Sequence, residues 1–287
     1  MKGKDISFTA MMTAYMRAYH AMNDTPKIFD DSLAYYLIPE EKRELIASSV
    51  SDQTNTFKPL IHTPNALSRA RYTEDALEKA IKQGIKQYVI LGAGLDTFAF
   101  RRSDLMEQLE VFEVDHPATQ EFKLHRLAEL GWKHPTKLHF IPIDFTKEGL
   151  VSALTRLQAY DRNVKSFFSW LGVTYYLTQN DVFATLCSIK DVTPEGSMVI
   201  FDYIHADAFI PEKSSQQMQK KLKRFRDVGE PMITGFIPST LAEDIVHLGF
   251  HLNMTLRLVD VKERYFKAIT DGYHAQEYEY IACATVK

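Results

Sequence analysis

A glycine-rich turn follows the short apolar run at residues 87–91. The chain continues with Gly92, Ala93 and Gly94, and Asp96 stands two positions further on. Glycine allows a tight turn and lets the backbone come close to a ligand, so a glycine turn between a strand and a helix is typical of nucleotide-binding sites. On its own the motif is weak, because many such turns bind nothing. Its meaning depends on the residues that close the neighbouring apolar runs.

Acidic side chains close the next two apolar runs. Asp115 follows residues 109–114, about twenty positions beyond the glycines, where a carboxylate can accept hydrogen bonds from both hydroxyls of a ribose. Asp144 follows residues 138–143 with Phe145 beside it, so the acid can accept from the amine of an adenine while the ring packs against the base. Strand-end acids also cap helices. Three consecutive strands that each end in such a group nevertheless predict a nucleoside site at one edge of a sheet.

The glycine turn argues against a dinucleotide as the ligand. The NAD fingerprint has a third glycine, which permits close packing of the helix on the strand, but Thr97 stands in that place. Asp96 adds a negative charge where a pyrophosphate needs amide groups and the positive end of a helix dipole. S-adenosylmethionine has no phosphate and carries a cationic amine and sulfonium, so it tolerates this acid. An NAD-dependent oxidoreductase remains an alternative.

An alternation of strands and helices would position these residues. Strands are expected at residues 87–91, 109–114, 138–143, 166–171, 197–201, 252–256 and 277–284. Segments with helical periodicity lie between them, at residues 119–130, 150–160 and 181–190. Alternation of this kind indicates βαβ units and a parallel sheet. The fifth run ends in Asp202, a further strand-end acid.

The N-terminal part of the chain reads mostly as helix. Apolar residues recur at helical spacing over residues 8–19, residues 30–32 can cap a helix over 33–37, and a long helix over 64–83 ends at Gly84. We therefore predict a helical cap over 1–84 and a Rossmann-like core over 85–287, within one compact α/β domain. A helical insertion is expected near 205–235.

Composition restricts the possible partners. The chain has 287 residues, of which 45% are apolar and 25% charged, and its formal net charge is −3. This charge argues against a protein that coats nucleic acid, and no run approaches the roughly 20 apolar residues of a membrane span. The N-terminus lacks the apolar stretch of a signal peptide, so a cytoplasmic location is expected. Cys187 and Cys283 are interpreted as buried thiols, and no spacing predicts a metal site.

These motifs resemble the leucine carboxyl methyltransferase-like family of S-adenosylmethionine-dependent methyltransferases, including its bacterial small-molecule branch. The matching segments are residues 13–18, 28–31, 91–97 with Arg101, 113–117, 143–145, 172–177, 229–231 and 249–250. The resemblance implies a class I methyltransferase fold, which is a seven-stranded sheet with an antiparallel last strand. It also implies S-adenosylmethionine as the cofactor and a small-molecule methyl acceptor.

The resemblance also implies roles for individual residues. Arg69 would grip the carboxylate of the methionine moiety, supported by Arg17 from the cap. Gly92 would lie under that moiety, and Tyr176 would face the reacting region as the catalytic residue. Asp115 would hold the ribose, as the spacing already predicts. By contrast, we interpret Arg71 as part of a surface ion pair.

One position departs from the family pattern. Members often have Glu before the glycine at position 172, whereas this chain has Leu171, with Trp170 before it. The change indicates a more apolar acceptor pocket. It also leaves open a non-catalytic module that binds a nucleoside or regulates a partner.

Methyl transfer from a sulfonium needs little from side chains. The leaving group is already activated, so the protein mainly aligns the acceptor and excludes water. We expect an O-methyltransferase. A carboxylate acceptor needs no base, whereas a hydroxyl or phenol does, and His205 and His116 are the candidates.

A helix expected over residues 211–226 could form part of the acceptor site. Met218, Leu222 and Phe225 make one apolar stripe, and cationic residues occupy the other faces, namely Lys220, Lys221, Lys223, Arg224 and Arg226. Such charges usually face water. The alternative is a lid whose cations attract an anionic acceptor. We then expect a small, partly apolar acid or phenol, enclosed by this helix, the cap, Tyr176 and Trp170.

Overall fold

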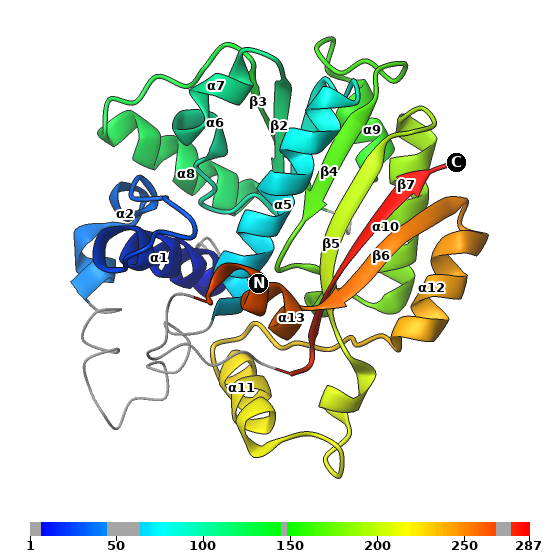
Figure 1. The fold of residues 1–287 in the computed structure, drawn as a ribbon. Helices are drawn as coiled ribbons and strands as arrows, with labels where there is room; N and C mark the ends of the chain where they lie inside the picture. Colours follow the sequence, from blue (N-terminus) through cyan, green and yellow to red (C-terminus); the bar gives the residue numbers. More distant parts are fainter. Residues whose placement is uncertain (1–6, 45–63, 145–147, 268–276) are drawn as a thin grey trace.

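A seven-stranded sheet runs through the centre of the molecule, with helices on both faces (Figure 1). The computed structural model describes residues 7–44, 64–144, 148–267 and 277–287. The strands are β1 Gln87–Leu91, β2 Glu110–Asp115, β3 Leu138–Pro142, β4 Ser166–Trp170, β5 Met198–Ile204, β6 Phe250–Arg257 and β7 Glu279–Val286. Their order in the sheet is β3-β2-β1-β4-β5-β7-β6, and β7 pairs antiparallel with both of its neighbours. The predicted class I methyltransferase sheet is confirmed.

Each predicted strand forms, and the largest error concerns β5. This strand continues to Ile204, so Asp202 lies inside it and is buried rather than standing at a strand end. The prediction was wrong there because a charged residue after an apolar run normally marks the end of a strand. Asp202 can be buried inside the sheet because Arg69 and the backbone amide of Gly172 both donate to its carboxylate.

The two faces of the sheet are covered by different helices. One face carries α5 Pro64–Lys82, α6 Phe98–Arg101, α7 Ser103–Met106 and α13 Leu258–Tyr265, and the other carries α9 Leu150–Thr155, α10 Gln179–Val192 and α12 Pro238–His247. Strand β1 shows why both faces need cover. Tyr88 and Ile90 pack in one core, whereas Val89 and Leu91 pack in the other. Alternating side chains point to opposite faces, so a strand buried on both sides reads as one apolar run.

A smaller helical layer lies beside the carboxyl ends of β1, β2 and β3. It consists of α1 Phe8–Asn23, α2 Ala34–Leu37 and α8 Pro117–Glu129, which share a third apolar core. Ser7 caps α1 by accepting from the backbone amide of Ala10 at 3.2 Å. Leu95 of the glycine loop is buried in the same core, so this helical layer contacts the loop directly.

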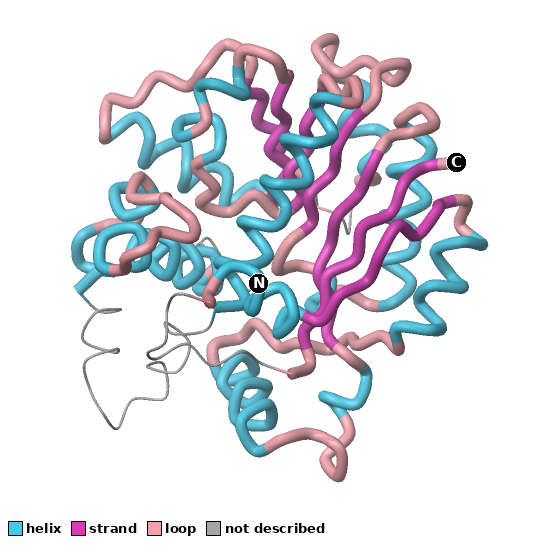
Figure 2. The backbone as a smooth tube through the Cα atoms, in the orientation of Figure 1, coloured by secondary structure: helices cyan, strands magenta, loops and turns pink. Residues whose placement is uncertain are grey.

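The segment between β5 and α12 forms the predicted helical insertion. It contains the short helix η2 Ala206–Phe209 and then α11 Gln216–Asp227, which stands apart from the sheet in Figure 2. The helix begins later than predicted because Ser215 caps it, accepting from the amide of Met218 at 3.3 Å. Met218 is buried, and Leu222 and Phe225 pack in the same cluster, so the predicted apolar stripe is confirmed.

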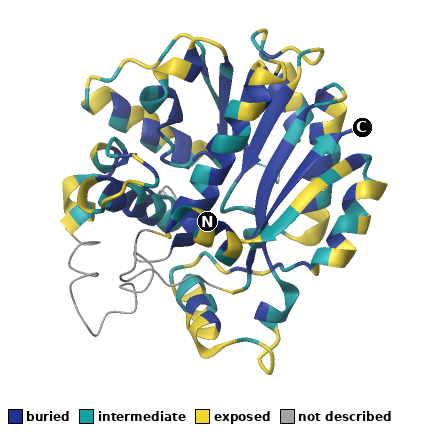
Figure 3. Cartoon of the chain, viewed as in Figure 1, coloured by how far each residue is buried: buried dark blue, intermediate teal, exposed yellow. Residues whose placement is uncertain are grey.

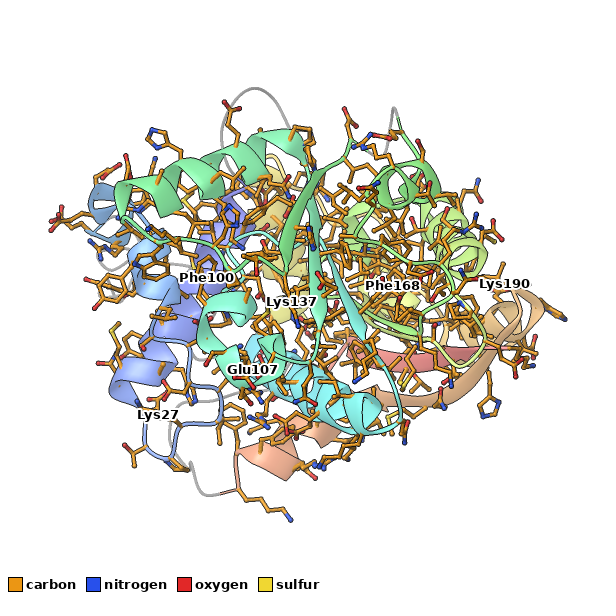
Figure 4. The ribbon with its side chains drawn as sticks, turned by 90° about the horizontal axis from the view of Figure 1, so that it is seen from above. Lys27, Phe100, Glu107, Lys137, Phe168 and Lys190 are labelled. Carbon is orange, nitrogen blue, oxygen red and sulfur yellow. The ribbon has the colours of Figure 1, made fainter. Side chains whose placement is uncertain are left out.

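Burial follows the layered arrangement. Figure 3 shows the strands mostly buried and the outer surfaces of α11 and α12 exposed. Phe168 of β4 lies within the packed interior in Figure 4, whereas Lys27 and Lys190 lie at the periphery. Within the described ranges, no helix is long and apolar enough to cross a membrane, and no cluster of His, Cys, Asp and Glu has a metal-binding arrangement.

Candidate active site

A cavity of about 460 Å³ opens at the carboxyl edge of the sheet, between α1, α5, the strand ends and α11. It brings together the described residues that the sequence predicted for cofactor binding, and Tyr176 with them. These are Arg69, Gly92, Ala93, Gly94, Asp96, Asp115, Asp144 and Tyr176. Phe145 was also predicted, but it lies outside the described residues.

The glycine loop fits closely between its neighbours. Gly92 and Gly94 have φ values of +70° and +53°, a region that favours glycine. A Cβ atom on Gly92 would overlap Cγ2 of Val173, so the position excludes any side chain. The amides of Gly92 and Ala93 both donate to the carbonyl oxygen of Val114, at 2.8 and 3.2 Å. The loop is therefore anchored to the end of β2.

Asp115 stands at the end of β2 and lines the cavity. One carboxylate oxygen accepts from the amide of Gly94, and the other accepts from the amide of His116 at 2.6 Å. Burial raises the pKa of Asp115, although both amide bonds favour its ionised form. The two bonds leave lone pairs on both oxygens for a ligand.

Asp96 and Asp144 also line the cavity, next to the glycine loop and the end of β3. Asp96 has a structural role as well, because its Oδ1 accepts from the amide of Phe98, the first residue of α6, at 2.6 Å.

Arg69 lies on α5 and is only 8% exposed. Its Nη1 donates to Oδ2 of Asp202 at 2.5 Å and to the hydroxyl of Tyr175 at 3.2 Å. The second oxygen of Asp202 accepts from the amide of Gly172 at 2.6 Å. The guanidinium lies so close to Gly172 that a Cβ there would be 2.9 Å from Nη2 of Arg69. Arg69 is thus fixed at the cavity wall by a carboxylate that the sequence did not assign to the site.

The other arginines have structural contacts. Arg17 donates to Oδ2 of Asp31 at 2.7 Å and to the carbonyl of Leu95 at 2.8 Å, so it braces the glycine loop instead of Arg69. Arg71 pairs with Asp75 one helical turn away, which confirms its surface role.

His116 and His205 each cap a helix. Nδ1 of His116 accepts from the amide of Ala118 at 3.3 Å, and Nδ1 of His205 accepts from the amide of Asp207 at 3.1 Å. His116 lines the cavity beside Asp115, whereas His205 is absent from the cavity wall. His205 is therefore not placed to act as a base.

Aromatic side chains of η1 Thr174–Tyr176 and α11 also line the cavity. The rings of Tyr175 and Tyr176 meet edge to face at 4.7 Å, and Phe225 of α11 lies 6.5 Å from Tyr176. Burial raises the pKa values of both tyrosines, so both remain neutral. Trp170, which the sequence placed in the pocket, is instead fully buried in the sheet core. Strand alternation turns it away from the cavity, and Leu171 lines the wall in its place.

Helix α11 contributes charge as well as apolar surface to the cavity. Lys221 is 8% exposed and pairs with Glu279 at the start of β7. Of the two alternatives left open for the cations of this helix, the one in which they face water does not apply to Lys221, because positions 218, 221, 222 and 225 share one helical face. Burial opposes ionisation of Glu279, but Lys221 and Arg69 hold the pKa of its carboxyl below the usual value. Arg224 lines the same wall, and burial lowers its pKa.

Glu230 joins the insertion to the N-terminal helix. Its two oxygens accept from the amides of Phe8 and Thr9, at 2.8 and 3.2 Å. A carboxylate at the start of a helix is stabilised by the unpaired amides and by the helix dipole. The sequence signal for this contact was only the family match at residues 229–231, which assigned no partner.

Comparisons with known proteins agree with this geometry. A model of the family described as leucine carboxyl methyltransferase matches residues 10–190. The chain is 34% identical over 296 aligned residues to YktD of Bacillus subtilis (strain 168), which is named as an S-adenosyl-L-methionine-dependent methyltransferase; 96% of this chain and 97% of the relative are covered. A relative in Mycobacterium avium (strain 104) with the same type of name is 27% identical, covering 69% of this chain and 66% of its own.

Solved structures share the fold at low sequence identity. A DUF574 family protein from Streptomyces avermitilis MA-4680 aligns with a TM-score of 0.62 at 14% identity, covering 98% of both chains. A protein from Thermobifida fusca YX, described as a methyltransferase, aligns with a TM-score of 0.56 at 13% identity, covering 95% of this chain and 94% of its own.

Proposed function

Because the chain belongs to the leucine carboxyl methyltransferase family and is an S-adenosylmethionine-dependent methyltransferase, we propose that it methylates an oxygen atom of a small-molecule acceptor. A carboxylate or a hydroxyl can supply this oxygen. The observation that carries the proposal is the two-part cavity, with the glycine loop and strand-end acids at one end and an aromatic, cation-bearing wall at the other.

The first part of the cavity fits S-adenosylmethionine. Gly92 leaves space beside Val173 that a Cβ atom would fill. The surrounding acids suit a ligand with a cationic amine and sulfonium but no phosphate. The loop residues Gly92, Ala93, Gly94 and Asp96 would contact the methionine moiety and the ribose. The carboxylate of Asp115 would accept from the ribose hydroxyls, and Asp144 with Phe145 would hold the adenine.

Arg69 is proposed to bind the carboxylate of the methionine moiety. Nη1 is engaged by Asp202, and this pairing fixes the plane of the guanidinium at the cavity wall. A fixed fork loses little conformational entropy when it binds a carboxylate. Tyr175 and Gly172 hold the same side chain in place.

Bound S-adenosylmethionine supplies a methyl group on an activated sulfonium leaving group. The protein has to align the acceptor oxygen and exclude water from the transfer. Tyr176 and Phe225 form the apolar wall that does this, and Tyr176 is proposed to contact the reacting region. The insertion near 205–235 and the helical cap over 1–84 would close the cavity, linked by the contact of Glu230 with α1.

A carboxylate acceptor accounts best for the groups at this wall. Among the described residues at or beside the wall, Glu230 is bound by two backbone amides, Glu279 by Lys221, and burial keeps Tyr175 protonated. Of the two candidate bases, His116 lines the cavity, but its Nδ1 is engaged by the amide of Ala118 and it follows Asp115 at the end of β2. A carboxylate needs no base and is attracted by Arg224.

A labelled-methyl assay tests the function. The protein is incubated with methyl-labelled S-adenosylmethionine and matched pairs of small acids and alcohols that share one apolar skeleton. We expect label in the acids, released as methanol by base because methyl esters are base-labile. Base-stable label in an alcohol or phenol would indicate a hydroxyl acceptor. Label on nitrogen, or binding without any transfer across a broad panel, would contradict O-methylation and favour another methyltransferase class or the non-catalytic alternative.

A further inference from the structure

Two cations, the partly buried Arg17 and the buried Lys123, bind consecutive carbonyl groups of the glycine loop. Arg17 of α1 donates from Nη2 to the carbonyl oxygen of Leu95 at 2.8 Å. Lys123 of α8 donates from Nζ to the carbonyl oxygen of Asp96 at 2.6 Å. The two cations come from different helices of the same layer, α1 and α8, so elements distant in sequence converge on one short stretch of backbone.

Each cation has its own buried carboxylate. Arg17 donates to Asp31, which is 1% exposed and also accepts from the hydroxyl of Thr97 at 2.5 Å. Lys123 pairs with Glu113, and both side chains are 1% exposed. The desolvation cost of such pairs largely offsets their attraction, so they contribute little to net stability. Because both ion pairs bind the same loop, their role is better explained by control of the loop's conformation than by stability.

The clamped loop leads directly to the proposed ribose carboxylate. Gly94, directly before Leu95, donates its amide to Asp115. The orientation of one peptide group restricts the next, because only φ and ψ vary between them. The carbonyls of Leu95 and Asp96 therefore influence where the amide of Gly94 points, and through it the orientation of Asp115.

We propose that the pairs Arg17–Asp31 and Lys123–Glu113 are positioning residues that hold the glycine loop in its cofactor-binding conformation. Through Arg17, docking of the N-terminal helix becomes coupled to cofactor affinity. This inference rests on the proposed cofactor site but is independent of the acceptor.

The contact of the Lys123–Glu113 pair with the loop should depend on pH near neutrality. Burial raises the pKa of Glu113 to about 7; Lys123 opposes the rise, whereas the carboxylates of Asp96 and Asp115 increase it. Protonation of Glu113 below that pH removes the counter-charge of Lys123 and weakens its hold on the loop. Cofactor affinity should therefore be full above pH 7 and decline as the pH falls through 7.

Titration calorimetry with S-adenosylhomocysteine tests the clamp on the full chain. We expect Arg17→Met and Lys123→Met each to raise Kd by about tenfold, the loss of one hydrogen bond to a charged group. Glu113→Gln should flatten the pH dependence of Kd between about pH 6 and 8, which a merely structural role would not do. The double variant Lys123→Met/Glu113→Gln removes both charges if the single lysine variant folds poorly. Ile189→Val on α10 is the control, because it loses core packing away from the loop.

The outcomes separate this inference from the cofactor assignment. Wild-type protein that binds S-adenosylhomocysteine, together with Arg17→Met and Glu113→Gln variants that keep its Kd and pH profile, would overturn the clamp alone. Wild-type protein that binds no S-adenosylhomocysteine would overturn both. Weakened binding in the clamp variants with unchanged binding in Ile189→Val supports the clamp.

Discussion

The two ends of the cavity are built by different means. At the proposed cofactor end, backbone atoms and strand-end carboxylates of β1, β2, β3 and the loops that follow them form most of the wall, and Arg69 of α5 completes it. At the proposed acceptor end, side chains of α1, η1 Thr174–Tyr176 and α11 meet from distant parts of the chain. On this proposal, the topology of the fold determines the cofactor site, whereas elements attached to the fold select the acceptor.

Charge is also handled differently at the two ends. At the proposed cofactor end, Asp115 and Asp96 are held by backbone amides, which leaves oxygen lone pairs for a ligand. At the acceptor end, Lys221 and Glu279 neutralise each other. Substitutions at the first end should therefore change cofactor affinity, and those at the second should change acceptor turnover with little effect on cofactor affinity.

The largest effect is expected at Gly92. In Gly92→Ala the new Cβ would overlap the side chain of Val173. Overpacking costs about 1–3 kcal/mol, so Kd for S-adenosylhomocysteine should rise by about 100-fold in calorimetric titration. Gly131→Ala is the matched control, since Gly131 has φ of +66° but nothing within 4 Å of the position that a methyl group would occupy. Equal Kd values in the two variants would mean that the close contact between Gly92 and Val173 does not control cofactor binding.

The next effect concerns Asp115. Asp115→Asn keeps the side-chain size but removes the charge that would accept from the ribose, and hydrogen bonds to charged groups contribute about 1.5–3 kcal/mol. Kd for S-adenosylhomocysteine should rise at least about tenfold. The melting temperature should fall as well, because Nδ2 of Asn cannot accept from one of the two backbone amides that Asp115 binds. Asp181→Asn, which alters the capping box of α10, is the control and should leave Kd unchanged. An unaltered Kd in Asp115→Asn would mean that Asp115 only anchors the glycine loop and does not bind the ribose.

The cofactor end could be predicted from sequence because its signals are local. Each strand is a short apolar run that ends directly in the residue it presents, so order along the chain gives position in space for Gly92, Asp115 and Asp144. The order of the sheet and the antiparallel last strand came from the family resemblance, since periodicity alone does not fix strand order.

The acceptor end was only partly predictable because its contacts join residues far apart in sequence. Lys221 and Glu279 are separated by 58 positions. The same limit applies to one pair at the cofactor end, because Asp202 and Arg69 are 133 positions apart. A charged residue on a helix predicts a solvated face unless its buried partner is known, which is why the sequence did not predict the burial of Lys221. The apolar stripe of α11 was predicted correctly, since its i, i+4 spacing is contained within the helix.

A smaller effect, confined to the acceptor end, is expected on α11. Phe225→Ala removes an apolar wall next to Tyr176, and burying one such side chain contributes about 1.5–3 kcal/mol. We expect kcat/KM for the acceptor to fall by about tenfold while Kd for S-adenosylhomocysteine changes by less than about twofold. Leu222→Ala is the control on the same helix, because Leu222 packs in the same cluster without lining the cavity. An equal loss of cofactor affinity in Phe225→Ala would mean that the two ends of the cavity do not act independently.

The smallest effect concerns the exposed cations of α11. Lys220 and Lys223 face water, and Lys223 pairs with Asp227, whereas Lys221 is buried and is left unchanged. Exposed charges attract an anionic acceptor only over about one Debye length, roughly 10 Å at 0.1 M salt. In Lys220→Glu/Lys223→Glu, kcat/KM for an acidic acceptor should therefore fall by only about twofold to threefold at low salt, and the loss should disappear at high salt. Lys79→Glu/Lys82→Glu makes the same change in net charge at the far end of α5 and should have no effect. Equal losses in both variants would mean that net charge matters and not the position of α11; a loss that persists at high salt would mean that the helix itself was disturbed.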